Sequence, residues 1–260
     1  MTLKVKVKLM DKRKRILLIL MTLIIVFVLL FFNEYYQSQK SKKLYEDARR
    51  YYYEYDEDIK IEDNTESAIN IDEEKVESIL GNENIVGWLY ISGTSIDYPV
   101  LQGEDNDFFL YNNYLREADQ AGSIYMDFRN KSLGEDDNYI IYGHKMKNGT
   151  MFSDLIKYVQ GDDRETFLEN HQLIQYDTLD GTTYWEIFSV YVVDLDSEDY
   201  HLFPQYRSDE KFEAVLEDAY SRSLLETGVE VTTEDEIMTL VTCSYWYDDA
   251  RAIIRLVRKD

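Results

Sequence analysis

Cysteine is almost absent from this chain of 260 residues, because Cys243 is the only one. A single cysteine excludes an internal disulfide, so its thiol is either a reactive group or an apolar filler of the core. Proline occurs only twice and glycine 11 times. These low counts exclude a collagen-like or low-complexity chain, and the apolar content supports a packed core.

Cations are also scarce, with 28 Lys and Arg against 51 Asp and Glu and a net charge of −23. The first 32 residues carry +6, so the rest of the chain carries −29. Nucleic-acid binding needs clustered cations that face phosphates, and this acidic body argues against nucleic acid as a partner. Tyrosine, in contrast, is abundant with 23 residues, which favours a β-rich domain because aromatic side chains suit pleated, half-buried surfaces.

One long hydrophobic run lies near the amino terminus. Residues 16–32 read ILLILMTLIIVFVLLFF, and these 17 residues are at the short end of the range for a helix that crosses a bilayer. The basic residues of the tail, 1–15, predict that the amino terminus stays in the cytoplasm and that the rest lies outside. The alternative is a cleaved signal peptide, but its apolar region is usually shorter and a small-residue cleavage site should follow it, whereas NEYY follows here. We therefore expect a single-pass anchor in the cell membrane.

The remaining chain divides into a polar connecting segment and a folded domain. Residues 33–74 are dense in charge and tyrosine, and we expect a stalk that is partly helical or disordered, with a solvated surface helix over 34–55 as the alternative. A short helix over 73–80 then begins the domain of residues 75–260. Eight strand-like runs with short turns favour an antiparallel barrel or sandwich. These runs cover residues 85–91, 96–101, 122–128, 139–144, 173–178, 183–193, 237–245 and 250–257.

Three helical patterns interrupt the strands, over residues 151–156, 164–171 and 208–223. In the longest, apolar side chains recur at helical spacing and Ser208 is a possible amino-terminal cap. The apolar positions of this helix are Phe212, Val215, Leu216 and Tyr220.

Three residues of the strand-like runs have the chemistry of acyl transfer. Cys243 closes the run TLVTC, His144 closes the run YIIYGH, and Arg251 begins the last apolar run. A thiolate attacks acyl groups, and the resulting thioester can pass its acyl group to an amine. A nearby cation lowers the pKa of a thiol, a histidine can carry the proton, and an arginine can stabilise the oxyanion.

Strand alternation distinguishes between the two arginines of the last run. Arg251 and Arg255 are expected on one face, but Arg255 lies about 13 Å further along at about 3.3 Å per residue, so Arg251 is the candidate. Each residue also has an ordinary explanation. Cys243 could be a buried filler, His144 a loop residue, and Arg251 the surface partner of Asp248 or Asp249; the other two histidines, His171 and His201, are expected to be solvated.

The joint pattern resembles the sortases, membrane-anchored cysteine transpeptidases of Gram-positive bacteria. The run TLVTC matches their TLxTC signature, YGH matches their histidine segment, and Arg251 matches their arginine. The likeness is strongest to class B and covers roughly residues 75–260. It is carried by GWLYI with IDYPVLQG, by GSIYMD, by YGHKMKNGTMF, and by the long helix over 208–223.

The resemblance implies a fold and a set of roles. The fold would be mainly β, a closed eight-stranded sortase-type barrel with an N-terminal helix, a long helix between late strands and an N-terminal transmembrane helix. Cys243 would be the nucleophile, His144 the general acid or base, and Arg251 the group that positions substrate and stabilises the oxyanion. Thr242 and Tyr142 would contact the substrate. No metal or other cofactor is implied.

The resemblance also implies the partners. The enzyme would cleave a C-terminal sorting motif of secreted proteins, associated in class B with Asn-Pro-type sequences, and transfer the acyl group to a peptidoglycan amine on the extracellular face. The membrane lipid would contact only the anchor. Val241 occupies a position where some class B members have serine, so any hydroxyl contact made there is absent. A hydrolytic cysteine peptidase and a catalytically silent, membrane-tethered binding module are the alternatives.

Overall fold

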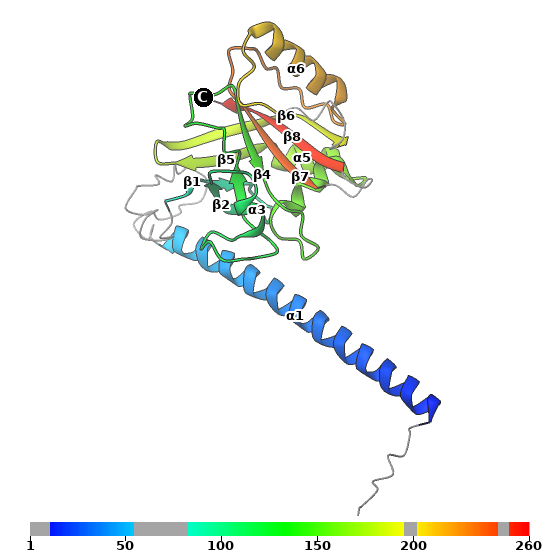
Figure 1. The fold of residues 1–260 in the computed structure, drawn as a ribbon. Coiled ribbons are helices and arrows are strands. Elements are labelled where there is room, and N and C mark those ends of the chain that lie inside the picture. The colour runs from blue at the N-terminus through cyan, green and yellow to red at the C-terminus, as the bar shows by residue number, and fades with distance from the viewer. Residues whose placement is uncertain (1–10, 55–82, 195–201, 244–249, 260) are drawn as a thin grey trace, which may run out of the picture. The chain divides into compact units, whose positions relative to one another are not determined.

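The first element of the structure is one long helix, α1 (Lys12–Glu54) (Figure 1). The structure, a computed structural model, describes residues 11–54, 83–194, 202–243 and 250–259. An 18-residue window of α1 has a mean hydropathy of 3.1 and no buried residue, so this helix is long and apolar enough to cross a membrane. The chain divides into two compact units, Met1–Lys40 and Ser41–Asp260. The helix expected over 73–80 lies outside the described residues.

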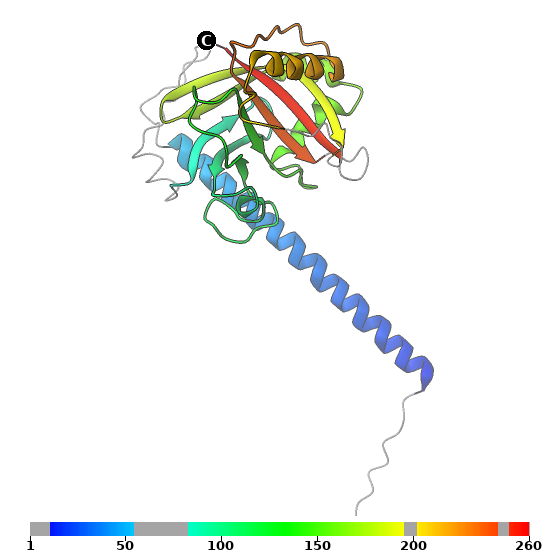
Figure 2. The same cartoon turned by 45° about the horizontal axis from the view of Figure 1, so that its top comes forward.

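Eight strands close into a barrel in the order β1-β2-β3-β4-β7-β8-β6-β5 (Figures 1 and 2). This closure confirms the expected eight-stranded barrel. The strands are β1 (Ile85–Tyr90), β2 (Asp97–Gln102), β3 (Ile124–Met126), β4 (Asn138–Tyr142), β5 (Leu173–Thr178), β6 (Gly181–Asp194), β7 (Ile237–Cys243) and β8 (Ala250–Lys259).

The expectation of an antiparallel barrel was wrong, because two of its strand pairs are parallel. Strand β2 runs parallel to β3, and β4 runs parallel to β7. A parallel pair needs a long crossover connection. The chain supplies one through residues 103–123, and a second that leaves β4, builds β5 and β6, and returns to β7. As a result β4 and β7 end at the same end of the barrel.

Short helices fill the connections between strands. They are α3 (Phe108–Tyr111), the 3-10 helix η1 (Phe152–Leu155), α4 (Ile156–Val159), α5 (Arg164–His171) and α6 (Asp209–Arg222). Helix α3 was not predicted. η1, α5 and α6 lie within the expected helical patterns, whereas α4 begins at the last residue of the pattern over 151–156. The cap of α6 is also as expected, since the side chain of Ser208 accepts a hydrogen bond from the backbone N–H of Lys211. In Figures 1 and 2, α6 covers the outer face of β6 and β8.

Two apolar clusters follow from the alternation of side chains in the strands. Ala252, Ile254 and Leu256 of β8 point into the barrel and join its main core. Ile253 and Val257 belong to a second cluster, on the outer face under α6, together with Phe212 and Leu216 and their neighbours. Strand β8 is therefore buried on both faces from Ala252 to Val257, and this stretch is apolar except for Arg255.

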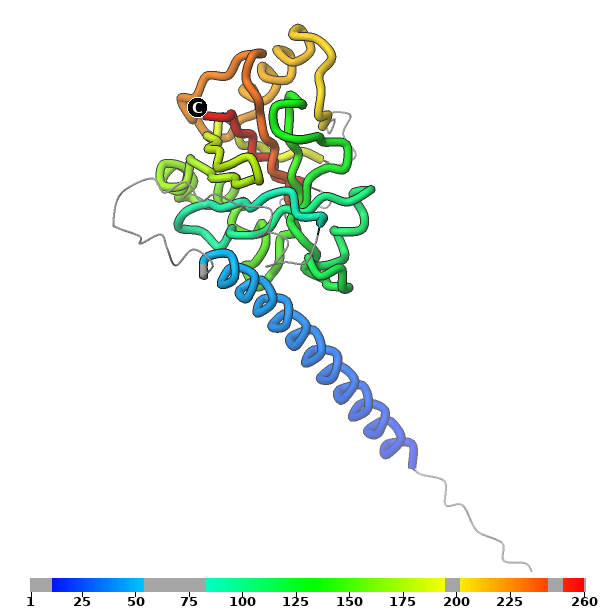
Figure 3. The backbone as a smooth tube through the Cα atoms, turned by 90° about the vertical axis from the view of Figure 1, so that its left-hand side faces the viewer, coloured from blue at the N-terminus to red at the C-terminus, as the bar shows by residue number. Residues whose placement is uncertain are grey.

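The end of α1 is part of the folded domain, which the sequence did not predict. Tyr45, Ala48 and Tyr52 are buried, and Figure 3 shows this part of the helix beside the first strands. The ring of Tyr52 stacks on Trp88 with centroids 4.0 Å apart, and its hydroxyl donates to Asp177 at 2.7 Å. A face of three buried residues spaced three or four apart is typical of a helix packed on a core.

Candidate active site

The backbone register places position 243 opposite position 251. In the antiparallel pair of β7 and β8, Cys243 pairs with Arg251, and Thr239 pairs with Arg255. Arg251 is partly exposed, and its Nη1 donates to the carbonyl of Ala250 at 3.1 Å. Its suggested surface partners, Asp248 and Asp249, lie outside the described residues.

The parallel pairing of β4 with β7 carries His144 to the same end of the barrel. Tyr142 is in register with Val241, and the backbone N–H of Gly143 donates to the carbonyl of Val241 at 3.1 Å. The chain therefore passes His144 beside the last residues of β7. A Cβ at Gly143 would lie 2.4 Å from Ile124 and 2.7 Å from Phe152, so only glycine fits between the strand and the histidine.

The imidazole of His144 is fixed by a backbone carbonyl. Its Nε2 lies 2.8 Å from the carbonyl oxygen of Leu110 in α3. A carbonyl can only accept, so Nε2 carries the proton, and in the neutral ring Nδ1 is then the basic nitrogen. Within the described part of the chain Nδ1 has no hydrogen-bond partner, and the ring is partly exposed. Nδ1 is thus the atom that can exchange a proton with a bound substrate.

Tyr142 belongs to a polar network behind the site. Its hydroxyl donates to Asp127 at 3.1 Å, and Asp127 also receives hydrogen bonds from Asn106 and from two nitrogens of the Arg129 guanidinium. Burial alone would raise the pKa of Asp127, but the hydrogen bonds from Arg129 and Asn106 outweigh it and lower that pKa. Arg129 also donates to the carbonyl of Leu202. Tyr142 is therefore tethered on one side while its ring stays partly exposed.

The side chains of Thr242 and Arg255 are buried, whereas that of Arg251 is partly exposed. The side chain of Thr242 is buried, and among the residues that the structure describes its hydroxyl has no hydrogen-bond partner. Arg255 is 4% exposed, and its guanidinium donates to the hydroxyls of Tyr191 and Tyr206. This burial agrees with the expectation that Arg255 does not share the site with Arg251.

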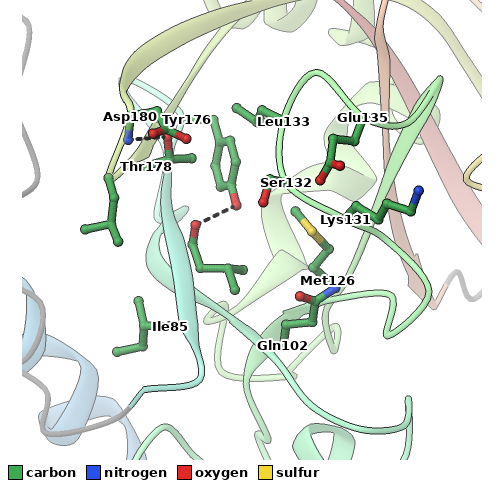
Figure 4. A pocket seen from close by; sticks show the side chains of 12 residues that line it. Ile85, Gln102, Met126, Lys131, Ser132, Leu133, Glu135, Tyr176, Thr178 and Asp180 are labelled. Atoms are coloured by element: carbon green, nitrogen blue, oxygen red, sulfur yellow. Dashed lines mark hydrogen bonds between the residues drawn. The ribbon is translucent and has the colours of Figure 1, made fainter. Parts of the chain in front are cut away.

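A cavity of about 390 Å³ lies at the opposite end of the barrel (Figure 4). It is bordered by the connection that enters β4 and by the turn between β5 and β6, whereas His144 follows the end of β4. Tyr176 borders it and its hydroxyl donates to the carbonyl of Val86 at 3.4 Å. The cavity is therefore separate from the residues expected to carry acyl transfer. Its lining residues are Ile85, Val86, Gln102, Met126, Lys131, Ser132, Leu133, Glu135, Tyr176, Thr178, Leu179 and Asp180.

Comparison with known proteins identifies the family. The family described as "Sortase domain" matches residues 89–259, about two thirds of the chain. The chain belongs to the sortase family. Sortase B of Listeria monocytogenes is 39% identical over 176 residues, which cover 67% of this chain and 69% of the relative. Sortase B of Staphylococcus aureus is 36% identical over 178 residues, which cover 68% of this chain and 70% of the relative.

A solved structure agrees with these relatives. The Staphylococcus aureus sortase B-substrate complex matches with a TM-score of 0.73 and 28% identity, over 86% of this chain and 98% of that chain. The predicted resemblance to class B is confirmed. This sortase is a cysteine transpeptidase, and neither alternative activity is favoured by any of these matches.

Several residues around the site were missed by sequence reasoning. Leu110 contributes through its backbone carbonyl, so its side chain gave no signal. Asp127 and Arg129 had a weak signal, a carboxylate directly after a strand followed two residues later by a cation. His171 is more tightly held than expected, because its Nδ1 lies 2.7 Å from the carbonyl of Ser92.

The hydrogen bonds around Asp127 predict that its contribution to the free energy of unfolding depends on pH. We expect Asp127→Asn to lower the free energy of unfolding near neutral pH by about 1–3 kcal/mol, because it removes the negative charge that Arg129 and Asn106 surround. A lowered carboxyl pKa gives a stabilisation that is fully present above the unfolded-state value of about 4. It decreases below that value and is lost as the pH falls through the lower folded-state pKa. Urea titrations of the full chain in detergent should therefore show a larger difference at pH 7 than at pH 3.

A surface ion pair provides the matched control for this measurement. Arg222 contacts Asp218 at 2.8 Å on α6, with both side chains partly exposed. Asp218→Asn should change the free energy of unfolding by no more than about 0.5 kcal/mol at either pH. An equal loss at pH 3 and pH 7 for Asp127→Asn would contradict the charge-based explanation.

Proposed function

We propose that Cys243, His144 and Arg251 together cleave a C-terminal sorting motif of secreted proteins and transfer the acyl group to a peptidoglycan amine. The observation that carries this proposal is the convergence of the three positions at one end of the barrel. Register places 243 opposite 251, and the parallel β4–β7 pair carries His144 beside them. These three residues are the nucleophile, proton carrier and cation that acyl transfer through a thioester needs.

The proton movements follow from the fixed histidine. The thiolate of Cys243 attacks the scissile carbonyl, and the tetrahedral intermediate collapses to a thioester as protonated His144 gives a proton to the leaving amine. An incoming amine then attacks the thioester and gives a proton to neutral His144. Collapse of the intermediate releases the new amide and regenerates the thiolate of Cys243. Because Nε2 is committed to Leu110, we assign both transfers to Nδ1.

Arg251 supplies a permanent positive charge. A guanidinium stays protonated throughout the working pH range, so it can stabilise the thiolate and then the oxyanion of each tetrahedral intermediate. Its side chain is partly exposed, which keeps it accessible to a substrate. We also assign Tyr142 a contact with the bound motif, because its ring is partly exposed and its hydroxyl is fixed on Asp127. For Thr242 we retain a contact through the backbone, since its side chain is buried.

We assign the domain to the extracellular face. Seven cationic residues precede the apolar part of α1 and one acidic residue lies among them, which favours a cytoplasmic amino terminus. The catalytic domain would then meet both secreted proteins and cell-wall amines while the helix holds it at the membrane.

A peptide assay tests the proposal. The full chain in detergent is incubated with a library of Asn-Pro-type sorting peptides, with and without triglycine as the amine, and the products are analysed by mass spectrometry. We expect a thioester adduct on Cys243 for the preferred motif and a peptide–triglycine product that rises with triglycine. Cleavage at a rate independent of triglycine, with free acid as the only product, would instead support the hydrolytic peptidase.

A further inference from the structure

The end of α1 reaches the segment that orients His144. Tyr45 is 3% exposed, and its hydroxyl donates to the carbonyl of Gly122 at 2.6 Å and lies 3.2 Å from the hydroxyl of Ser123. Burial raises the pKa of Tyr45, so the phenol stays protonated and keeps donating at any working pH. A buried hydrogen bond of this kind fixes the two backbone segments that it joins.

The first route from Tyr45 leads to the imidazole ring. Gly122 has φ +56° and packs so closely on α3 that a Cβ there would lie 2.4 Å from the carbonyl oxygen of Leu110. The next residue, Ser123, donates its backbone N–H to Phe109 at 2.9 Å. The carbonyl of Leu110 is the one that accepts from Nε2 of His144. Tyr45 thus holds the backbone of Gly122, and Gly122 packs against Leu110, whose carbonyl accepts from the ring of His144.

The second route leads to the main chain of the same histidine. The ring of Tyr45 packs edge-on against Tyr98, with centroids 5.3 Å apart. The hydroxyl of Tyr98 accepts from the backbone N–H of Met151 at 3.0 Å, and the adjacent N–H, that of Phe152, donates to the carbonyl of His144 at 2.9 Å. One tyrosine of the helix therefore touches both supports of the histidine, although they belong to different loops.

We propose that Tyr45 is a positioning residue for acyl transfer, and that the C-terminal end of α1 fixes the orientation and tautomer of His144. This inference rests on the proposed proton-carrying role of His144. A ring held by one carbonyl keeps Nδ1 in a constant position, whereas a shift of that carbonyl by a fraction of an ångström lets both ring orientations and both tautomers be populated. The helix is then needed for proton transfer as well as for attachment.

The test compares two tyrosines of the same helix. Tyr45→Phe removes the hydroxyl bonded to Gly122, and Tyr52→Phe removes the hydroxyl bonded to Asp177, which has no connection to His144. Both are studied in the full chain in detergent, with a sorting peptide and triglycine. We expect Tyr45→Phe to lower kcat about 10-fold, with KM within twofold, and to displace the limb of the pH–rate profile that reports His144. Tyr52→Phe should lower the thermal midpoint but leave kcat and the pH profile unchanged.

The tautomer of His144 can be measured without any turnover. Nitrogen-15 spectra of histidine-labelled protein, assigned by their loss in His144→Gln, should show the Nε2–H form in the unmodified chain and in Tyr52→Phe, and a mixture of both forms in Tyr45→Phe. The conservative variant Tyr98→Phe breaks the second support and serves in place of Tyr45→Phe should the latter not fold. An Nδ1–H form in the unmodified chain, or an unchanged kcat and tautomer in both variants, would overturn the inference. A tautomer shift in a chain without transpeptidation would refute the proposed function and leave the positioning role standing.

Discussion

Cys243→Ala should abolish thioester formation and lower kcat/KM by about 10⁴-fold or more, because no other residue can hold the acyl group. Cys243 is the only thiol of the chain, so a second cysteine cannot substitute for it. The barrel should be unaffected, since the substitution removes one sulfur atom at the end of β7 and leaves the backbone pairing with Arg251 in place. Peptide cleavage is measured by chromatography, and the adduct by mass spectrometry of the intact protein.

Cys243→Ser gives the matched control, because it preserves size and replaces the thiol by a hydroxyl. A serine hydroxyl is not ionised near neutral pH, so this variant should be nearly as inactive as the alanine variant while its thermal midpoint and circular dichroism stay those of the unmodified chain. Retention of cleavage by both variants would show that Cys243 is not the nucleophile. If a folded Cys243→Ala chain kept its biological function in cells, the chain would act as a binding module.

His144→Gln should lower kcat/KM by about 10²–10⁴-fold, because it removes the group that moves the proton between thiol and amines. Glutamine keeps an N–H that can donate to the carbonyl of Leu110, so the loop retains its local bonding. The loss should therefore be chemical rather than structural. The thioester should form slowly, with a smaller dependence on pH in the pH–rate profile than the unmodified chain shows.

His171→Gln is the control for this variant. Its ring is also hydrogen-bonded to a backbone carbonyl, that of Ser92, but it lies at the end of α5, before β5, a strand that pairs with β1 and β6 and not with β7. We expect its kcat/KM to stay within about twofold of the unmodified value, because surface changes outside the site have small effects. Equal losses in the two variants would mean that histidine hydrogen bonds act on stability and that His144 carries no proton.

Local patterns explain how much of the fold could be predicted. The alternation of apolar residues located all eight strands, and in β8 it separated Arg251 from the inward-facing Ala252, Ile254 and Leu256. The helix of residues 209–222 followed from its apolar spacing and from Ser208 at its start. These patterns are local, so they can be recognised in the sequence before the pairing partner of each strand is known.

The direction of strand pairing could not be predicted, because it depends on where long connections return. Nothing local to β4 indicates that β7, almost a hundred residues later, pairs beside it in parallel. The same limit applies to the end of α1. Its tyrosines looked like part of a polar stalk, and only the barrel surface decides that Tyr45 and Tyr52 are buried.

Residue types and their spacing were enough to predict the family of this sortase and a helix apolar enough to cross a membrane. One thiol, the YGH segment, the arginine that begins the last strand and the run of 17 apolar residues are properties of residue type and spacing, and they can be read along the chain. How His144 is held follows only from the folded chain. Its ring lies against the backbone carbonyl of Leu110, and Leu110 packs on Gly122, whose carbonyl accepts from Tyr45 of α1. Every residue carries the same backbone carbonyl, so only the fold can select the one that bonds the ring of His144.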